Sequence, residues 1–198
     1  MNKLVLATRN RHKAVELRTF LGELPFEIVT LNDFVENIEL KEEGSTFREN
    51  ALQKARIVYE HTHLLSLADD SGLEVFYLNG RPGVFSARYA GEDTTDVLNN
   101  QKLLAEMKGV APRRRRAQFR SVLALVGEGI EELTEGICGG VLAESPRGTN
   151  GFGYDPIFIP DGFSRTYAEL TADEKNLISH RARSFEKMKG IMKAKLLR

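Results

Sequence analysis

The stretch that decides the fold is KLVLATRNRHKAVELRTFLGELPFEIVTL, residues 3–31. Residues 4–7 are continuously apolar, which is typical of a strand that is buried on both faces. Polar residues follow from Thr8, and apolar residues then recur with a helical period from about 11 to 21. Residues 26–31 predict a second strand. A strand, a helix and a strand in this order predict an α/β fold.

The next segments continue the alternation. Thr46 and Glu49 have the spacing of a capping box, which predicts a helix from there to about residue 61. Residues 64–68 predict a strand that ends where the acidic pair Asp69 and Asp70 begins.

The second half of the chain contains more strands than helices. A helical pattern covers 95–107, with Leu98, Leu103 and Leu104 on its apolar face. Residues 118–126 and 132–142 predict paired strands, 157–159 predict a short strand, and a long amphipathic helix begins near Ser179. Because strands alternate with helices early and cluster later, we expect a mixed sheet.

The composition is that of an ordinary globular protein. The 198 residues suit one compact domain or two closely associated lobes. Lys and Arg (28) balance Asp and Glu (28), so net charge gives no argument for a nucleic-acid or membrane partner. The single cysteine, Cys138, excludes an internal disulfide, and the lack of a His/Cys cluster around it disfavours a zinc site. The sequence shows neither a signal-peptide core nor a membrane span, so we expect a reduced, cytoplasmic setting.

The first candidate site is the polar segment that opens the first helix: Thr8, Arg9, Asn10, Arg11, His12 and Lys13. Backbone N–H groups and the helix dipole attract anions at such a position. Cations are disfavoured there by about 0.3–1 kcal/mol each, and a bound polyanion would reverse that penalty. A solvated basic turn is the alternative.

Lys54 is the second candidate, because it falls within the apolar stripe that Phe47, Ala51 and Val58 mark on their helix. A lysine that points inward is rarely left unpaired. Either its stem carries the ammonium to the surface, which this segment alone favours, or it faces a cleft that holds anions.

Acidic residues flank the helix that carries Lys54. Glu42 and Glu43 precede it, and Asp69 and Asp70 follow the next strand. Mg²⁺ takes one or two carboxylates and leaves its other positions to water and substrate phosphates. We therefore expect a magnesium site here, with a carboxylate that orients or deprotonates water. An Asp-rich turn is the alternative.

Cations also gather around the start of the last helix, at Lys175, His180, Arg181 and Arg183. Two helix starts rich in cations suggest a negatively charged ligand between them. The run of four arginines at 113–116 has no aromatic platform and predicts a solvated loop rather than a nucleic-acid site.

Six ordered motifs run along nearly the whole chain. They are TRNRHK (8–13), EEGSTFRENALQKA (42–55), ADDSGL (68–73), PGVFSARY (82–89), GFGYDP (151–156) and SHR (179–181). Each alone is weak, but together they closely resemble the inosine triphosphate pyrophosphatase family, which hydrolyses non-standard purine nucleotides.

The resemblance implies a single nucleoside-triphosphate pyrophosphatase domain over residues 1–198. Its fold would be α/β, with an elongated mixed central sheet flanked by helices and an active-site cleft between two lobes. It also implies a homodimer and a Mg²⁺-dependent reaction. ITP, dITP and XTP would be cleaved between the α- and β-phosphates to the monophosphate and pyrophosphate, which removes them from the nucleotide pool.

The same resemblance implies roles for individual residues. The segment from Thr8 to Lys13 would bind the triphosphate together with Lys54. Glu42 and Asp70 would bind the metal, and Asp70 would also accept the proton of the attacking water. Glu43 stays open as the alternative ligand, and Asp69 would hold a second metal or support Asp70. The remaining nucleotide contacts would come from Ser71, Phe152, Gly153, Tyr154, Asp155, Lys175, His180 and Arg181.

Two positions depart from the pattern of many relatives, which have glycine where His12 and Asn150 stand. Neither departure removes a charged group. Asparagine tolerates positive φ, so the loop around Asn150 is able to keep a glycine-like conformation.

With the phosphates assigned elsewhere, we interpret the loop GTNGFGYDP (148–156) as a base pocket. Gly151 and Gly153 let the backbone approach closely, Phe152 offers a face for a purine, and Asp155 would accept from a base N–H. Donors at His180 or Arg181 would match the 6-oxo group and reject adenine. Two alternatives stay open: a pyrophosphatase for pyrimidine or modified-base triphosphates, and a nucleotide sensor or nucleic-acid-binding module that uses the arginine run.

Overall fold

The computed structural model describes residues 2–22, 24–34 and 38–197. Its helices and strands are, in chain order, β1 (Asn2–Leu6), α1 (Arg11–Leu21), β2 (Phe26–Thr30), α2 (Phe47–Thr62), β3 (Leu65–Val75), α3 (Asp96–Glu106), β4 (Arg116–Gly127), β5 (Ile130–Leu142), β6 (Phe158–Pro160), α4 (Ala172–Ile178) and α5 (His180–Leu196). Within the described residues, no helix is both long enough and apolar enough to cross a membrane.

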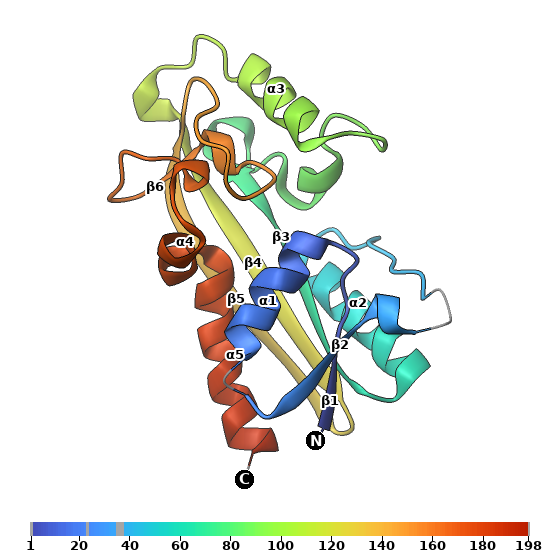
Figure 1. Cartoon of the computed structure of the whole chain (residues 1–198). Helices are drawn as coiled ribbons and strands as arrows, with labels where there is room; N and C mark the ends of the chain where they lie inside the picture. Colours follow the sequence, from blue (N-terminus) through green and yellow to red (C-terminus); the bar gives the residue numbers. More distant parts are fainter. Residues whose placement is uncertain (1, 23, 35–37, 198) are drawn as a thin grey trace. The chain divides into compact units, whose positions relative to one another are not determined.

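The strands form one six-stranded sheet in the order β2-β1-β3-β4-β5-β6 (Figure 1). Strand β1 pairs in parallel with both β2 and β3, which explains why residues 4–7 are continuously apolar and fully buried. Strand β6 pairs antiparallel with β5. The predictions of an α/β fold and of a mixed sheet are confirmed.

The chain divides into two compact units, each with its own hydrophobic core. Unit 1 contains Met1–Asp70, Ser121–Gly136 and Arg181–Arg198, and unit 2 contains Ser71–Arg120 and Ile137–His180. Apolar residues of α1 and α5 pack together in unit 1, and residues of α3, β6 and the segment before α4 pack together in unit 2. The inward face predicted for the last helix is confirmed, since Phe185, Met188 and Met192 are buried. The single domain over 1–198 stays a prediction.

Strand β3 is longer than the sequence predicted. The prediction that it ends at Asp69 is wrong, because the strand continues through Asp69, Asp70, Ser71 and Gly72 to Val75. Aspartate is disfavoured in strands, but both carboxylates here bind cations from neighbouring helices. These contacts offset the cost of burying the two charges.

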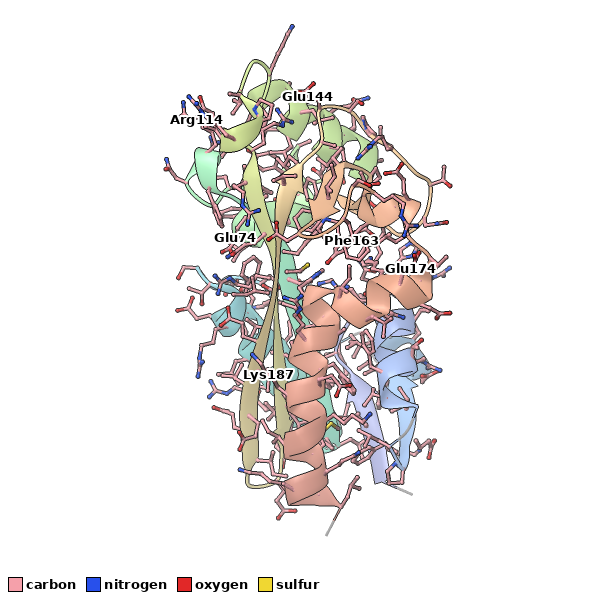
Figure 2. All side chains as sticks on the ribbon, turned by 90° about the vertical axis from the view of Figure 1, so that its left-hand side faces the viewer. Glu74, Arg114, Glu144, Phe163, Glu174 and Lys187 are labelled. Carbon is pink, nitrogen blue, oxygen red and sulfur yellow. The ribbon has the colours of Figure 1, made fainter. Side chains whose placement is uncertain are left out.

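The structure of the arginine run at 113–116 also differs from the predicted solvated loop. Arg115 is buried and donates from all three guanidinium nitrogens to the carbonyls of Met107, Leu142 and Ala143. The solvated loop is therefore wrong for Arg115, which ties the start of β4 to the end of β5. Arg114 lies at the surface over the ring of Tyr77 (Figure 2).

Two features of the helices were missed or misassigned. Leu98 is 47% exposed, so its place on the apolar face of α3 is wrong. That helix buries Asn99 and Asn100 beside Leu103. Helix α4 was not predicted, although Thr171 and Glu174 form a capping box at its start.

Candidate functional site

Helix α1 starts at a polar turn that directly follows β1. Thr8 Oγ1 accepts from the Asn10 backbone N–H at 3.1 Å, and Asn10 Oδ1 caps the helix by accepting from the Lys13 backbone N–H at 3.1 Å. Arg11 and His12 are exposed in this first turn, and Arg9 donates to the Ile38 carbonyl at 2.9 Å. The predicted cation-rich helix start therefore exists, and its binding of an anion stays a prediction.

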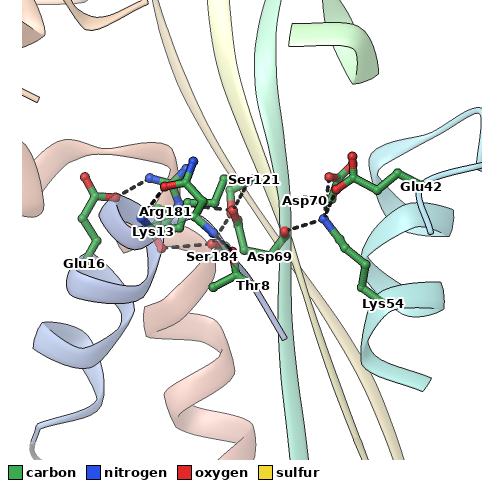
Figure 3. Close-up of polar contacts among 11 residues, drawn as sticks. Thr8, Lys13, Glu16, Glu42, Lys54, Asp69, Asp70, Ser121, Arg181 and Ser184 are labelled. Carbon is green, nitrogen blue, oxygen red and sulfur yellow. Dashed lines mark hydrogen bonds and ion pairs between the residues drawn. The ribbon is translucent and has the colours of Figure 1, made fainter. Parts of the chain in front are cut away.

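Asp69 is fully buried and binds cations from two helices (Figure 3). Its Oδ2 lies 2.9 Å from Lys13 Nζ and 3.4 Å from Arg181 Nε, and its Oδ1 accepts from Ser121 Oγ at 2.7 Å. Burial alone would raise the pKa of Asp69, but Lys13 and Arg181 hold it far below its usual range. Asp69 is therefore a permanent anion with both oxygens engaged, an arrangement that favours a structural role over binding a second metal.

Further residues complete this cluster behind Asp69. Arg181 pairs with Glu16 of α1, and the Ser184 hydroxyl lies 3.0 Å from that of Ser121. Lys13 and Arg181 thus find compensating charges within unit 1. Glu16 lies three residues after Lys13, a helical spacing that predicts a pair with Lys13, whereas its ion pair with Arg181 joins residues 165 positions apart and is not predictable from spacing. Nothing in the sequence distinguishes Ser121 or Ser184 from ordinary core serines.

Lys54 lies on the other side of β3 and is 3% exposed (Figure 3). Its Nζ lies 2.7 Å from Glu42 Oε1, 2.8 Å from Asp70 Oδ1 and 2.9 Å from the Asp69 carbonyl oxygen. The favoured prediction that Lys54 reaches the surface is wrong, because these oxygens hold the ammonium inside. Burial alone would lower the pKa of Lys54, but the attraction of Asp70 and Glu42 outweighs burial and raises the pKa above its usual value, so the lysine stays charged.

The carboxyl group of Asp70 is held on one side only. Burial raises its pKa, more than the attraction of Lys54 lowers it. Its Oδ2 is buried and accepts no hydrogen bond from the residues that the structure describes. A buried carboxylate oxygen without a donor is suited to bind a cation or to accept a proton.

Glu42 and Asp70 both bind the ammonium of Lys54, which brings two carboxylates together on this side of β3. Across the described ranges, no group of three or more His, Cys, Asp or Glu side chains is placed to hold a metal ion. Two carboxylates, one with a free oxygen, still fit Mg²⁺, which prefers few protein ligands. Glu43 contacts Gln53 through its backbone, so the geometry favours Glu42 as the ligand.

In unit 2, the loop that contains Phe152 folds around a buried ion pair. Asp155 Oδ2 accepts from Lys175 Nζ at 2.6 Å and from the Phe152 backbone N–H at 3.0 Å. Lys175 Nζ lies 4.8 Å from the centre of the Phe152 ring. At Gly151, where φ is +74°, a Cβ atom would lie 2.0 Å from Asp155 Oδ2. Direct acceptance from a base N–H by Asp155 stays a prediction.

The other predicted nucleotide contacts lie on buried or half-buried elements. Tyr154 is buried and its hydroxyl donates to the Ser86 carbonyl at 2.8 Å, so it anchors the loop. His180 is buried in unit 2 and stacks on Phe119 with ring centres 4.7 Å apart. Ser71 is half-buried on β3, directly after Asp70.

Asn150 needs no glycine-like backbone. Positive φ outside glycine occurs at His63 and Asn79 among the described residues, but not at Asn150. The Asn150 side chain instead donates to the Leu170 carbonyl at 2.9 Å, and its backbone N–H donates to the Ala168 carbonyl. The side chain thus fixes the loop where many relatives have glycine.

The chain resembles known proteins over nearly its whole length. A model of the Ham1 family matches residues 4–191. A dITP/XTP pyrophosphatase of Geobacter sulfurreducens is 47% identical over 190 residues, which cover 96% of either chain. The solved structure of a HAM1 protein from Coxiella burnetii is 42% identical with a TM-score of 0.88, covering 98% of this chain and 100% of that one. The Staphylococcus aureus Ham1 protein is 34% identical with the same TM-score, at 98% and 99% coverage.

Proposed function

The chain belongs to the Ham1 family, and from this membership we propose that it hydrolyses purine nucleoside triphosphates bearing hypoxanthine or xanthine. The products are the nucleoside monophosphate and pyrophosphate. The name dITP/XTP pyrophosphatase of the Geobacter relative supports this substrate class. The observation that carries the proposal is the buried Asp70 Oδ2, which accepts from no donor among the described residues and lies next to the buried ammonium of Lys54.

Asp70 is the proton acceptor. Water forms a bond to the α-phosphorus, the bond from that phosphorus to the bridging oxygen breaks, and the proton of the water passes to Asp70. The buried Asp70 Oδ2 supports this role, because it accepts no hydrogen bond from the described residues. Lys54 stays protonated and stabilises the negative charge that develops on the phosphates.

Glu42 and Asp70 would hold Mg²⁺, which when bound supplies charge neutralisation for the phosphate oxygens. The fit rests on the free Asp70 oxygen and on the two carboxylates that share one ammonium. Because Lys54 already binds both acids, it fixes their positions relative to each other.

The segment from Thr8 to Lys13 is the second phosphate-binding element of the proposal. The side chain of Lys13 is 15% exposed, and its ammonium has three donors, of which Asp69 takes one. The exposed Arg9 and Arg11 add positive charge at the helix start. This arrangement leaves donors for phosphate oxygens without breaking the buried ion pair.

The loop of unit 2 would bind the base. Phe152 is half-buried and offers a ring face, and the Asp155–Lys175 pair beneath it keeps the loop in one conformation. Donors of His180, on its ring or its backbone, would match the 6-oxo group of hypoxanthine or xanthine. An amino group at that position would leave these donors unmatched, at a cost of about 1–3 kcal/mol each.

The proposal extends to the setting of the enzyme. It acts as a homodimer in the cytoplasm and removes damaged purine nucleotides before they enter DNA or RNA. Light scattering of the purified protein tests the dimer: a mass close to twice 22.2 kDa is expected.

The decisive experiment measures pyrophosphate release from ITP, dITP, XTP, dUTP, dTTP and the standard purine triphosphates, with and without Mg²⁺. We expect turnover of the hypoxanthine and xanthine nucleotides only, and only with the metal. A preference for a pyrimidine, or release of orthophosphate alone, would contradict the proposal. Activity that survives a chelator would remove Mg²⁺ from it.

A further inference from the structure

The first two turns of α3 hold both backbone groups of Gly153. Asp96 Oδ2 accepts from the Gly153 N–H at 2.6 Å, and Asn100 Nδ2 donates to the Gly153 carbonyl at 2.8 Å. Asp96 and Asn100 are four residues apart, so they lie on the same face of the helix. Thr95 fixes the first turn by capping α3. All these residues belong to unit 2.

The side-chain amide of Asn100 acts as a hydrogen-bond donor. Its amide donates to the Asp96 carbonyl at 2.8 Å as well as to Gly153, so the side-chain nitrogen faces two acceptors. Its Oδ1 is buried and has no hydrogen-bond partner among the described residues. Leaving an acceptor unsatisfied has a cost, and the two donated bonds offset it. The orientation of the amide therefore follows from its partners.

Holding Gly153 determines the direction of the loop on either side of it. The residue has a φ of +62°, a left-handed conformation suited to glycine. Its two neighbours are anchored differently. Tyr154 is buried and bound to Ser86, whereas Phe152 is half-buried, donates its backbone N–H to Asp155 and has its ring beside the Lys175 ammonium. Because Gly153 directly follows Phe152, the backbone that α3 holds contributes to the direction of the Phe152 ring.

We propose that Asp96 and Asn100 are positioning residues that aim the Phe152 ring and so set the selectivity for the base. The role rests on the proposed function, because it presumes that Phe152 stacks on a purine. Neither side chain is assigned to contact substrate. Their effect passes through Gly153, and it concerns how tightly and how selectively the base is bound rather than the hydrolytic step.

Two variants test the proposal against matched controls. Asn100→Asp keeps the shape of the side chain but replaces the donor by an anion, and Gln101→Glu adds the same charge at the exposed next position of α3. Asp96→Ala removes the acceptor, and Asp93→Ala removes a charge from the exposed segment before the helix. Thermal unfolding of all four variants confirms that each is folded.

The kinetic readout separates positioning from chemistry. Asn100→Asp and Asp96→Ala should raise the KM for dITP by about tenfold, because the loss of one or two hydrogen bonds weakens binding by about that factor. The kcat should change little. The ratio of kcat/KM for dITP over dATP should fall in both, and the controls should match the wild type. Variants that keep the KM and the selectivity of the wild type would overturn the proposal.

A second readout does not depend on activity. Hydrogen exchange of the peptide that contains Gly153 should accelerate in Asp96→Ala and Asn100→Asp but not in the controls. An unchanged exchange rate in an active protein would overturn the positioning role alone. A wild type that hydrolyses no purine triphosphate would instead overturn the proposed function, and the two failures are thus distinguishable.

Discussion

Asp69 and Asp70 are adjacent on β3, but their carboxylates lie on opposite sides of the strand, each bound to a lysine from a different helix (Figure 3). The alternation of side chains along a strand produces this separation. Asp69 faces Lys13 and Arg181 and has both oxygens engaged. Asp70 faces Lys54, and its Oδ2 accepts from no donor in the described part of the chain. One dipeptide thus supplies a structural anion and the carboxylate to which our proposal assigns the proton transfer.

The two aspartates should respond differently to the same substitution. Asp70→Asn should lower the rate of pyrophosphate release by about 10²–10⁴-fold and leave the fold intact, because Glu42 still pairs with Lys54. Asp69→Asn should destabilise the protein by about 3–5 kcal/mol, because it removes the charge that the buried Arg181 and the partly buried Lys13 share. Urea unfolding and activity assays on both variants make the comparison. Near-normal turnover in Asp70→Asn would remove its proposed role.

Magnesium dependence should distinguish Glu42 from Glu43. Glu42→Gln removes one of the two carboxylates at Lys54, so the Mg²⁺ concentration for half-maximal activity should rise by about tenfold or more. Glu43→Gln is the matched control and should behave as the wild type. A metal titration of pyrophosphate release measures both. Equal shifts, or a larger shift for Glu43→Gln, would count against Glu42 as the ligand.

The arginine run should show one residue that matters for stability. Arg115→Met leaves three carbonyl groups without their donor and should lower the free energy of unfolding by about 2–5 kcal/mol. Arg113→Met, at an exposed position two residues earlier, should change it little. Chemical unfolding followed by circular dichroism tests this contrast, and equal stability of the two variants would contradict it.

Gly151 should tolerate a side chain less well than another glycine of unit 2. Gly162→Ala places a methyl group in open space at a φ of +85° and should cost about 1–2 kcal/mol from the backbone alone. Gly151→Ala adds a collision with Asp155 and should cost more, with weaker binding of nucleotide because Lys175 loses its partner. Melting temperatures and the KM for dITP, measured for Gly151→Ala and Gly162→Ala, test this difference. Similar losses in both variants would show that the loop yields to the methyl group.

Acid should weaken the start of helix α4 through Glu174, which lies at the surface (Figure 2). The Arg165 side chain and the Thr171 backbone N–H lower the pKa of Glu174 from 4.5 to about 2. The unfolded chain therefore binds more protons between these values, so the stabilisation is complete above about pH 4.5 and is lost as the pH falls toward 2.

The measurement is the stability of the wild type minus that of Glu174→Gln across this range. The difference should shrink on acidification. A pH-independent difference for Glu174→Gln would show that the carboxylate contributes nothing to folding.

The local structure around the first helices was predictable because short-range patterns determine it. The bounds of α1 and the capping box at Thr46 follow from sequence spacing alone. Strand β3 was not predictable beyond residue 68, since the cations that Asp69 binds come from 56 residues earlier and 112 residues later in the chain. Local pattern does not contain such pairings.

The candidate site shows the same division. Motifs identify Lys54, Glu42 and Asp70 as a group, but they do not reveal that the lysine is buried between the two acids. Asn100 carries no signal at all, because its contact with Gly153 joins residues 53 positions apart. Arg115 is one of four identical neighbours, and only the three-dimensional position of the Met107, Leu142 and Ala143 carbonyls distinguishes it.

The Asp69 cluster has a consequence for how the protein is made. Arg181 follows Asp69 by 112 residues, and all of unit 2 lies between them in the sequence. During synthesis on the ribosome, Asp69 therefore has Lys13 but not Arg181 as a cationic partner until every residue of unit 2 has been translated. Unit 1 is begun first and completed last, so unit 2 is the earlier of the two to have its full sequence available for folding.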